Sequence, residues 1–390
     1  MTRILIITSE FPPGPGGIGT HAFQLASSLN RAGWLVQVVS PQYYADEEEL
    51  LAFNTQQPFK IESLPSHQFK LLQNIKRASV INRNIRDFKP DLVVASGGRA
   101  IWLSAFLLAL RKIPWVLVGH GTEFGQKSGL NAWLTRFAGN QADLVICVSQ
   151  YTQKALKDLG IVRPPSFVVH NGADHTRYFP LPKLEAAAFR ERKGVGDKFV
   201  LLTVGSVSRR KGQEVVIRAL PEIKDEHPNI EYWMVGLPGQ QAELEIMADD
   251  LGVSENIRFL GRVSNESLLE LYNACNLFVM TSRQLEDGDF EGYGIAVIEA
   301  ALCGKPAVVS DNSGLAEAVQ DGITGLLVPQ NDPQRTAAAV LSLMEDPEML
   351  KKLGAQAYEN ASRNQTWEQV GHQYVDLLDG VIKVSGLDKQ

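Results

Sequence analysis

Cysteine is scarce in this chain, and its scarcity excludes two classes of protein. Only three cysteines occur in 390 residues, Cys147, Cys275 and Cys303, and each lies within an apolar segment. An odd number of widely spaced thiols argues against a disulfide framework and against a cysteine-ligated metal cluster. We therefore expect three buried, reduced thiols.

Long apolar runs are missing as well. The longest, Ile101–Leu110, is about half of the ~20 residues that a membrane-spanning helix needs, so we expect a buried helix there. The apolar run after Met1 is too short for a signal peptide, and no small-residue cleavage site follows it. The sequence therefore predicts a cytoplasmic protein, and peripheral contact with the inner face of the membrane stays open.

The chain also lacks the excess of positive charge that nucleic-acid binding requires. Its net charge is −6, so nucleic acid is not expected as a partner. A hydrophobic content of 44% and a charged content of 21% are typical of ordinary globular proteins. Because 390 residues exceed the usual size of a single core, two domains are expected.

Short runs rich in Val, Ile and Leu alternate with longer amphipathic stretches along nearly the whole chain. Continuous apolar runs of this kind suit parallel strands that are covered by helices on both faces. The expected strands are Ile4–Ser9, Val36–Ser40, Asp91–Ala95, Trp115–Gly119, Leu144–Ser149, Phe167–His170, Phe199–Val204, Glu231–Val235, Ile257–Leu260, Leu277–Thr281, Ala307–Ser310 and Gly325–Val328. The predicted fold class is α/β, with two doubly wound Rossmann-like domains facing each other across a cleft.

The domain boundary is expected between Asn171 and Lys198, an interval that contains two prolines and several glycines. This places a first domain over residues 1–180 and a second over residues 190–369. The last helical pattern is long enough for residues 370–390 to cross back and pack on the first domain. Ligands of such domains bind beyond the carboxyl ends of the strands, so functional residues are expected in the loops that follow the strands.

A glycine-rich loop follows the first expected strand. Gly14, Gly16 and Gly19 satisfy the pattern G-x-G-x-x-G, which raises the alternative of a nicotinamide-dependent oxidoreductase. The inserted Pro12-Pro13 lengthens the turn, and the second strand ends at Val38–Pro41 without the acidic residue that would hold a ribose. A Tyr-x-x-x-Lys pair is also absent from the sequence. The dinucleotide interpretation is therefore disfavoured.

A weaker inference about this loop survives. Backbone amides at Gly16 and Gly17 can approach a phosphate or a sugar at the start of the helix that follows, which is expected from Thr20 to Ala32. The alternative is a loop that is merely flexible.

Two glutamates flank a predicted helix start in the second half. Glu291 lies in a loop, the helix begins near Gly294, and Glu299 falls more than a turn inside it. The free amides near Gly294 and Ile295 carry partial positive charge, so one carboxylate on each side can hold hydroxyls that flank a diphosphate. The alternative is an acidic residue favoured by the helix dipole, followed by an unrelated exposed glutamate.

The sequence offers basic side chains where a metal-binding Asp-x-Asp motif would be expected. No Asp-x-Asp follows a strand of the first domain, and Asp287-Gly-Asp289 lies beside Glu291 in the second. Arg209-Arg210-Lys211 instead follows the strand Phe199–Val204, which suits cationic stabilisation of a departing diphosphate without a metal. An ordinary solvated basic turn is the alternative.

One histidine, His120, stands out because it follows the apolar strand Trp115–Gly119 and lies between two glycines. A hydrogen-bonded structural histidine is the alternative to a functional one.

The stretch Glu291–Pro306 resembles the E-x7-E signature of retaining glycosyltransferases of the GT-B fold, family four. Further fragments occur in family order, namely Gly16–Gly19, Gly119–Glu123, Asn171–Asp174, Arg210–Gly212 and Gly325–Pro329. The resemblance implies an acceptor-side first domain and a second domain that binds the nucleotide sugar.

The resemblance also implies roles for single residues. Glu291 would contact the donor sugar, Glu299 the ribose, and His120 the donor-sugar pocket. Relatives carry an arginine directly after the glycine equivalent to Gly205, where this chain has Ser206. Lys211 is therefore assigned to the departing phosphates, and Arg209 and Arg210 are left as alternative substitutes.

The implied reaction is retaining transfer of a hexosyl group from GDP-mannose or a UDP-hexose to an acceptor hydroxyl. It belongs to polysaccharide, glycolipid or glycoconjugate biosynthesis and needs no cofactor besides the nucleotide diphosphate sugar, which is the donor substrate. His120, Glu291 and Lys211 are the predicted catalytic residues. A non-catalytic nucleotide-sugar-binding subunit is a further alternative, beside the oxidoreductase.

One further sequence pattern bears on the chemical nature of the acceptor. Six basic residues interleave with apolar ones between Lys70 and Lys89, as in a helix that lies on an anionic membrane surface. This pattern suits a lipid-linked acceptor, although a sugar acceptor is equally compatible with the motifs. The alternative is a covering helix whose charges simply face water.

Overall fold

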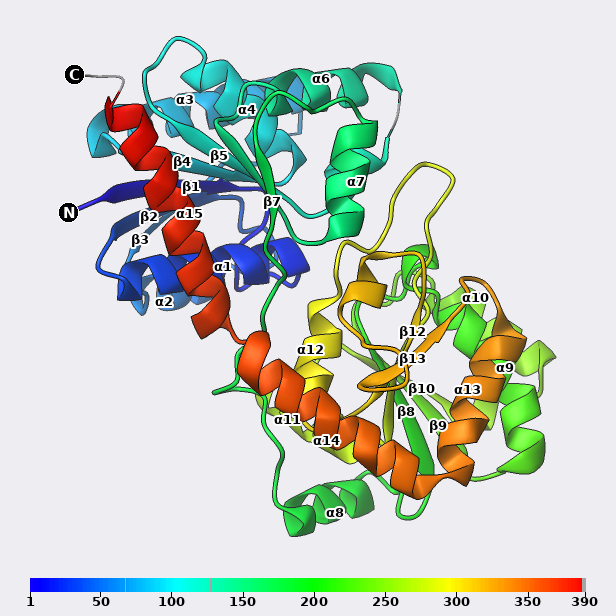
Figure 1. The fold of residues 1–390 in the computed structure, drawn as a ribbon. Coiled ribbons are helices and arrows are strands. Elements are labelled where there is room, and N and C mark those ends of the chain that lie inside the picture. Colours follow the sequence, from blue (N-terminus) through cyan, green and yellow to red (C-terminus); the bar gives the residue numbers. More distant parts are fainter. Residues whose placement is uncertain (67, 127, 388–390) are drawn as a thin grey trace. The chain divides into compact units, whose positions relative to one another are not determined.

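The protein is described by a computed structural model that covers residues 1–66, 68–126 and 128–387. The chain divides into two compact units, one formed by residues 1–171 together with the segment from Trp367 onward, and one formed by residues 172–366. Each unit is built on its own parallel sheet, which confirms the predicted pair of Rossmann-like folds (Figure 1).

The described part of the first unit holds a seven-stranded sheet of order β3-β2-β1-β4-β5-β6-β7. Its strands are β1 (Arg3–Thr8), β2 (Leu35–Ser40), β3 (Lys60–Ser63), β4 (Leu92–Ser96), β5 (Trp115–Gly119), β6 (Leu144–Cys147) and β7 (Ser166–Val168). Its helices are α1 (Gly17–Arg31), α2 (Glu47–Thr55), α3 (Lys70–Phe88), α4 (Gly98–Leu108), α5 (Thr122–Gly125), α6 (Gly129–Gly139), α7 (Gln150–Asp158) and α15 (Trp367–Leu387).

Strand β1 shows why the strands of this sheet read as continuous apolar runs. Leu5 and Ile7 belong to the core shared with helices α3, α4, α6 and α7. Ile4 and Ile6 point to the other face and belong to the core shared with α1 and α15. Because helices cover both faces, successive side chains must all be apolar.

Helix α15 lies beside α1 in Figure 1 and completes one face of the first unit. The hydroxyl of Tyr374 is 2.9 Å from Nε2 of His21. A Cβ atom at Gly371 would lie 2.7 Å from Cβ of Ser28, so the two helices approach closely at that point.

The described part of the second unit holds a six-stranded sheet of order β10-β9-β8-β11-β12-β13. Its strands are β8 (Phe199–Val204), β9 (Ile230–Val235), β10 (Ile257–Gly261), β11 (Leu277–Met280), β12 (Ala307–Ser310) and β13 (Gly325–Val328). Its helices are α8 (Lys183–Arg192), α9 (Gln213–Glu226), α10 (Gln241–Asp250), α11 (Asn265–Ala274), α12 (Ile295–Leu302), α13 (Pro333–Glu345) and α14 (Pro347–Asn364), with short 3-10 turns η1 (Arg209–Lys211), η2 (Ser254–Asn256) and η3 (Gly314–Glu317).

Strand β11 divides its side chains between the two faces of the second sheet. Leu277 and Val279 join the core shared with α9, α10 and α13. Phe278 points the other way, toward Tyr272 of α11, with ring centroids 6.1 Å apart. In each sheet the strand order reverses once, between β1 and β4 and between β8 and β11. The carboxyl ends of these strand pairs are where doubly wound folds bind ligands.

The three cysteines are buried and free, as predicted. The segment Ile101–Leu110 departs from the expected buried helix, because α4 ends at Leu108 and the side chains of Phe106 and Leu110 are exposed. No helix in the described ranges has the length and apolar character that a membrane crossing requires.

Helix α3 carries the basic stretch between Lys70 and Lys89, and its basic side chains differ in exposure and in their partners. Lys70 and Lys76 are exposed, whereas Arg77 is buried. Arg83 forms an ion pair with Glu62. The basic pattern therefore corresponds only partly to a row of solvated charges.

Candidate active site

A basic turn follows strand β8 in the second unit. The turn η1 (Arg209–Lys211) ends at Gly212, whose backbone is left-handed with φ of 70°. A Cβ atom at Gly212 would lie 2.0 Å from the carbonyl oxygen of Thr281, so only glycine fits there. The hydroxyl of Thr281 donates a hydrogen bond of 2.8 Å to the carbonyl of Gly212. The turn is thereby held against the residue that follows strand β11, at the point where the strand order reverses.

The two basic side chains of this turn meet Glu291. The Lys211 ammonium lies 2.7 Å from Oε2 of Glu291, and Arg210 contacts the same carboxylate oxygen. Arg210 also lies 3.2 Å from a carboxylate oxygen of Asp289. A Cβ atom at Gly205 would lie 3.0 Å from Cε of Lys211, which shows that the lysine passes directly over the end of strand β8.

The charge state of Glu291 follows from its two cationic neighbours. Burial alone would raise the pKa of this carboxyl, but the charges of Lys211 and Arg210 outweigh burial and lower the pKa to about 2. Burial lowers the pKa of the Lys211 amine, and the charge of Glu291 opposes that effect. This partly buried ion pair contributes little to stability, whereas a strongly shifted pKa beside charged partners is typical of a functional site.

Helix α12 begins immediately after this carboxylate. Its N-cap is Gly294, with φ of 85° and ψ of 71°, and its first turn contains neither a capping side chain nor an acidic residue. A Cβ atom at Gly294 would lie 2.3 Å from the side chain of Leu315. The amides at the start of the helix are therefore available to an anion.

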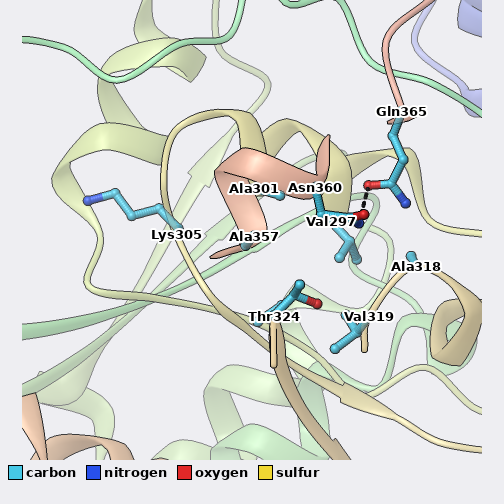
Figure 2. Close-up of a pocket in the computed structure, with 10 residues that line it drawn as sticks. Val297, Ala301, Lys305, Ala318, Val319, Thr324, Ala357, Asn360 and Gln365 are labelled. Carbon is cyan, nitrogen blue, oxygen red and sulfur yellow. Dashed lines mark hydrogen bonds between the residues drawn. The ribbon is translucent and has the colours of Figure 1, made fainter. Parts of the chain in front are cut away.

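The loop between Glu291 and α12 is anchored from behind. The hydroxyl of Tyr293 accepts a hydrogen bond of 3.0 Å from Nε2 of Gln365, and Gln365 accepts one of 3.4 Å from Asn360. Figure 2 shows Gln365 and Asn360 joined behind α12, beside a cavity of about 10 Å³ lined in part by Val297 and Ala301. A cavity of this size holds at most one water molecule, so the back of the helix is no substrate pocket.

The second carboxylate, Glu299, has aromatic partners. The Tyr272 hydroxyl donates a 2.6 Å hydrogen bond to Oε2 of Glu299. The ring of Tyr178 meets the ring of Tyr272 edge-on, with centroids 5.5 Å apart. Burial raises the pKa of Glu299, while the hydrogen bond from Tyr272 opposes the rise.

In the first unit, His120 follows strand β5. Its Nε2 is 2.8 Å from the hydroxyl of Ser96, which ends the neighbouring strand β4. Burial lowers the pKa of His120 to about 4, so the imidazole is neutral at pH 7. The amides of His120 and Gly121 donate hydrogen bonds of 3.2 Å and 2.9 Å to one carboxylate oxygen of Glu123. Burial raises the pKa of Glu123 to about 7 despite these hydrogen bonds.

The glycine loop of the first unit leads into α1, which begins at Gly17 rather than near Thr20 as the pattern indicated. Gly16 and Gly17 are both exposed. A Cβ atom at Gly16 would lie 2.2 Å from a carboxylate oxygen of Glu10, whereas one at Gly17 would meet nothing within 4 Å. The helix start is therefore open at Gly17.

With this geometry established, comparisons with known proteins decide the family. The sequence model of the family Glycosyltransferase Family 4 matches residues 15–177, and that of the family Glycosyl transferases group 1 matches residues 185–360. The chain is 30% identical over 385 residues to a GDP-mannose-dependent alpha-(1-6)-phosphatidylinositol monomannoside mannosyltransferase of Mycolicibacterium smegmatis, covering 97% of this chain and 98% of the relative. This chain belongs to the family-four glycosyltransferases.

Two further likenesses support this assignment. The glycosyltransferase is 27% identical to glycogen synthase of Mycobacterium tuberculosis, over 94% of this chain and 92% of that one. It also matches the crystal structure of Anabaena HepE in complex with UDP and glucose, with a TM-score of 0.81 and 25% identity over 97% of this chain and all of that one. The predicted GT-B fold and hexosyltransferase class are confirmed, and the oxidoreductase alternative is disfavoured.

The structure distributes the predicted residues of the glycosyltransferase over two sets. In the second unit, Arg210 and Lys211 converge on Glu291, whereas the Arg209 side chain is exposed and the Arg209 carbonyl accepts a hydrogen bond from Arg283. Glu299 lies within helix α12, beyond the open amides near Gly294 and Ile295. The first unit supplies His120, Gly16 and Gly17.

Sequence reasoning missed the partners of these residues. Tyr178 and Tyr272 hold Glu299, and Ser96 holds His120. No sequence motif identifies these three residues, because their contacts depend on packing between segments that are distant in the sequence. Glu123 was visible as the last residue of the fragment Gly119–Glu123 but was given no role of its own.

One cluster in the described residues has the composition of a metal site. Ligand atoms of Glu226, His227 and Glu345 lie within 4.8 Å of one another. These residues lie at the ends of helices α9 and α13, which pack against each other, and α9 leads from there to the amino end of strand β9, away from the loops of the candidate site.

Proposed function

We propose that this glycosyltransferase transfers a hexosyl group with retention of anomeric configuration and without a metal ion. The donor is GDP-mannose or a UDP-hexose, and the acceptor is the hydroxyl of a glycolipid. The observation that carries the proposal is the pairing of one ionised, partly buried carboxylate, Glu291, with Lys211 and Arg210 beside the open helix start at Gly294.

Each group in the second unit suits one part of a nucleotide sugar. The Glu291 carboxylate accepts a hydrogen bond from a hydroxyl of the donor sugar. Lys211 and Arg210, which contact Glu291 in the structure, then become available to the diphosphate. Lys211, Arg210 and the amides near Gly294 and Ile295 then stabilise the negative charge that grows on the departing phosphates. Glu299 accepts hydrogen bonds from the ribose.

The bond changes follow from this placement. The bond between the anomeric carbon and the diphosphate oxygen breaks, and the acceptor oxygen attacks the same face of the sugar. The departing phosphate takes the proton of the acceptor hydroxyl. His120, being neutral at pH 7, contributes a hydrogen bond to the donor sugar and no charge. Gly16 and Gly17 are assigned to the donor through their exposed backbone.

Fixed cations also support metal independence. Arg210 and Lys211 already supply two positive charges, and Asp289, the second acid of the Asp-Gly-Asp motif, pairs with Arg210. We therefore expect full activity in EDTA.

The substrates of related enzymes guide the choice of donor and acceptor. The mycobacterial relative is described as dependent on GDP-mannose and as acting on a phosphatidylinositol monomannoside, while HepE was crystallised with UDP and glucose. Both nucleotide types therefore remain candidate donors, and a glycolipid is the favoured acceptor class.

Incubation with a panel of nucleotide sugars tests the proposal. We expect slow release of free nucleotide diphosphate from GDP-mannose or one UDP-hexose, unchanged by EDTA, because water can replace the acceptor. With an accepted glycolipid, NMR of the product should show the anomeric configuration of the donor. An inverted product, or activity that EDTA abolishes, would contradict the mechanism.

We further propose that the enzyme acts at the inner face of the membrane through the start of helix α3. Phe69, Leu71 and Ile75 are 65%, 72% and 56% exposed there, next to the exposed cations Lys70 and Lys76. Apolar side chains with neighbouring lysines are typical of helices that bind an anionic lipid surface.

A further inference from the structure

An arginine lies buried in the first unit without full hydrogen bonding. Arg77 of helix α3 is 4% exposed, and its Nε donates a hydrogen bond of 3.2 Å to the carbonyl of Pro65. Its guanidinium lies 5.4 Å from the ring centroid of Tyr43. Its Nη2 is buried and has no hydrogen-bond partner. A buried guanidinium N–H that lacks an acceptor is unfavourable, so an acceptor from outside the chain is expected.

A second arginine faces the same region. Burial, and after it the charge of Arg99, lowers the pKa of Arg77. Within the part of the chain that the structure describes, Arg99 donates a hydrogen bond of 3.4 Å to an uncharged partner, Oε1 of Gln73. Within residues 1–66, 68–126 and 128–387, neither arginine forms an ion pair. Gln73 lies one helical turn before Arg77 on α3, so Arg99 contacts the same helix close to Arg77.

The start of helix α4 adds hydrogen-bond donors beside Arg99. The helix begins at Gly98, after the left-handed Gly97 with φ of 86°, and its first turn has no capping side chain and no acidic residue. Glu123 is the acid that approaches, since a Cβ atom at Gly98 would lie 4.0 Å from its Cγ. Burial raises the pKa of Glu123 to about 7, so at neutral pH it brings only part of a negative charge.

The position of these groups connects them to the transfer reaction. Gly97 directly follows Ser96, whose hydroxyl is 2.8 Å from Nε2 of His120. Strands β4 and β5 are neighbours in the sheet, so the start of α4 and His120 share one edge of the first unit. An anion bound at Arg99 would bring the rest of its molecule close to His120.

We propose that Arg77, Arg99 and the first turn of α4 bind a phosphate group of the acceptor. The acceptor is then a phosphorylated molecule, either a soluble phosphomonoester or the phosphodiester headgroup of a lipid. This inference rests on the proposed transfer to an acceptor hydroxyl, because it assigns the acceptor's charge and not the donor's. Guanidinium groups suit the task, since their planar N–H donors match phosphate oxygens.

Phosphate binding to the full-length protein tests the site directly. The protein is first saturated with the nucleotide diphosphate that its donor releases, so that the donor site is filled. Inorganic phosphate, myo-inositol 1-phosphate, uncharged myo-inositol and vesicles of phosphatidylcholine with phosphatidylinositol are then compared by calorimetry and sedimentation. We expect inorganic phosphate to bind, and either the soluble ester or the vesicle to bind more tightly, which distinguishes the two sources.

Variants locate the binding. Arg99→Gln changes an exposed residue, so the fold should persist, and the affinity for inorganic phosphate should fall about tenfold with the loss of charged hydrogen bonds. Arg77→Lys keeps the charge but removes the fork and should weaken binding as well. Arg86→Gln, on the exposed side of the same helix, is the matched control and should bind as the wild type does.

Two outcomes overturn the inference: no phosphate binding by the nucleotide-saturated wild type, or equal binding by Arg99→Gln and the wild type. These outcomes are separate from a failure of the proposed function, which would appear as no release of nucleotide diphosphate from any donor. If phosphate binds but no donor is used, the anion site stands and its role in the acceptor falls.

Discussion

At the scale of single residues, the site depends on charge states that burial and close neighbours determine. Glu291 is ionised because Lys211 and Arg210 contact it, with its pKa at about 2. His120 is neutral at pH 7 because burial lowers its pKa to about 4. In the proposed mechanism, the Glu291 carboxylate accepts hydrogen bonds from hydroxyls of the donor sugar, and His120 adds a hydrogen bond without placing a positive charge beside an oxocarbenium-like sugar.

The buried histidines predict how stability depends on pH. Burial lowers the pKa of His120 to about 4, and burial and the charge of His120 lower the pKa of His21. Because the unfolded state takes up these protons first, stability falls as the pH drops below about 6.5. For His120 alone the loss at pH 5 is about 2 kcal/mol, given its pKa of about 4.

Urea unfolding at pH 7 and pH 5 measures this effect. His120→Gln should lose less stability between the two pH values than the wild type, by about 2 kcal/mol. The exposed His175 provides a control, since His175→Gln should keep the wild-type dependence. An equal loss in His120→Gln and the wild type would show that His120 titrates normally.

The contacts of individual residues were predictable from sequence to different degrees. Glu291 and Lys211 are recognisable because they occur in short motifs after strands, and the structure brings them into contact. The choice between Arg209 and Arg210 was open, because neighbouring residues in a turn point in different directions that spacing does not reveal. Tyr272 and Arg77 were not predictable as site residues, since their positions depend on how helices pack.

At the scale of elements, the strand–turn–helix connections fix the site. Continuous apolar runs predicted twelve strands, which the structure confirms, but strand β3 (Lys60–Ser63) was missed. It is a short edge strand in which Lys60 and Ser63 are exposed, so it lacks the apolar run of a strand covered on both faces. The helix start at Gly17 was also misplaced, because glycine weakens the helical pattern without preventing the helix.

The turn at Gly212 offers a prediction with a matched control. Gly212 and Gly252 have similar left-handed backbones, with φ of 70° and 68°, but only Gly212 lies against another group, the Thr281 carbonyl. Alanine at Gly252 should therefore cost only the conformational penalty of about 1–2 kcal/mol. Gly212→Ala should in addition displace Arg210 and Lys211 and reduce donor turnover at least about tenfold.

Steady-state release of nucleotide diphosphate, compared with thermal unfolding of the same samples, separates these effects. We expect Gly252→Ala to retain wild-type turnover despite its lower stability. If Gly212→Ala turned over donor as fast as Gly252→Ala does, the geometry of the basic turn would not matter for catalysis.

At the scale of the whole molecule, the two units carry different parts of the reaction in this account. The second unit supplies Glu291, Lys211 and Glu299 for the nucleotide sugar, and the first supplies His120 and the arginines assigned to the acceptor. The two-domain α/β organisation was predictable from length and from strand pattern. The basic amphipathic pattern between Lys70 and Lys89 was recognisable as well, whereas the exposure of its single side chains was not, because exposure depends on packing.

Membrane binding is predicted to involve one end of α3 only. Lys70→Glu/Lys76→Glu should abolish sedimentation with anionic vesicles, because these lysines flank the exposed Phe69, Leu71 and Ile75. Arg86→Glu/Lys89→Glu changes the net charge equally at the other end of the helix and should sediment as the wild type does. Equal loss in both variants would indicate a general charge effect, and no loss in either would remove α3 from the interface.

The central claim is that transfer of the sugar requires the Glu291 carboxylate, which forms ion pairs with Lys211 and Arg210. Glu291→Gln preserves the size of the side chain and removes its charge, and the measurement is release of nucleotide diphosphate from the accepted donor together with nucleotide affinity. We predict turnover reduced by about 100-fold or more, with nucleotide affinity within about threefold of the wild type. Turnover equal to that of the wild type would contradict the account.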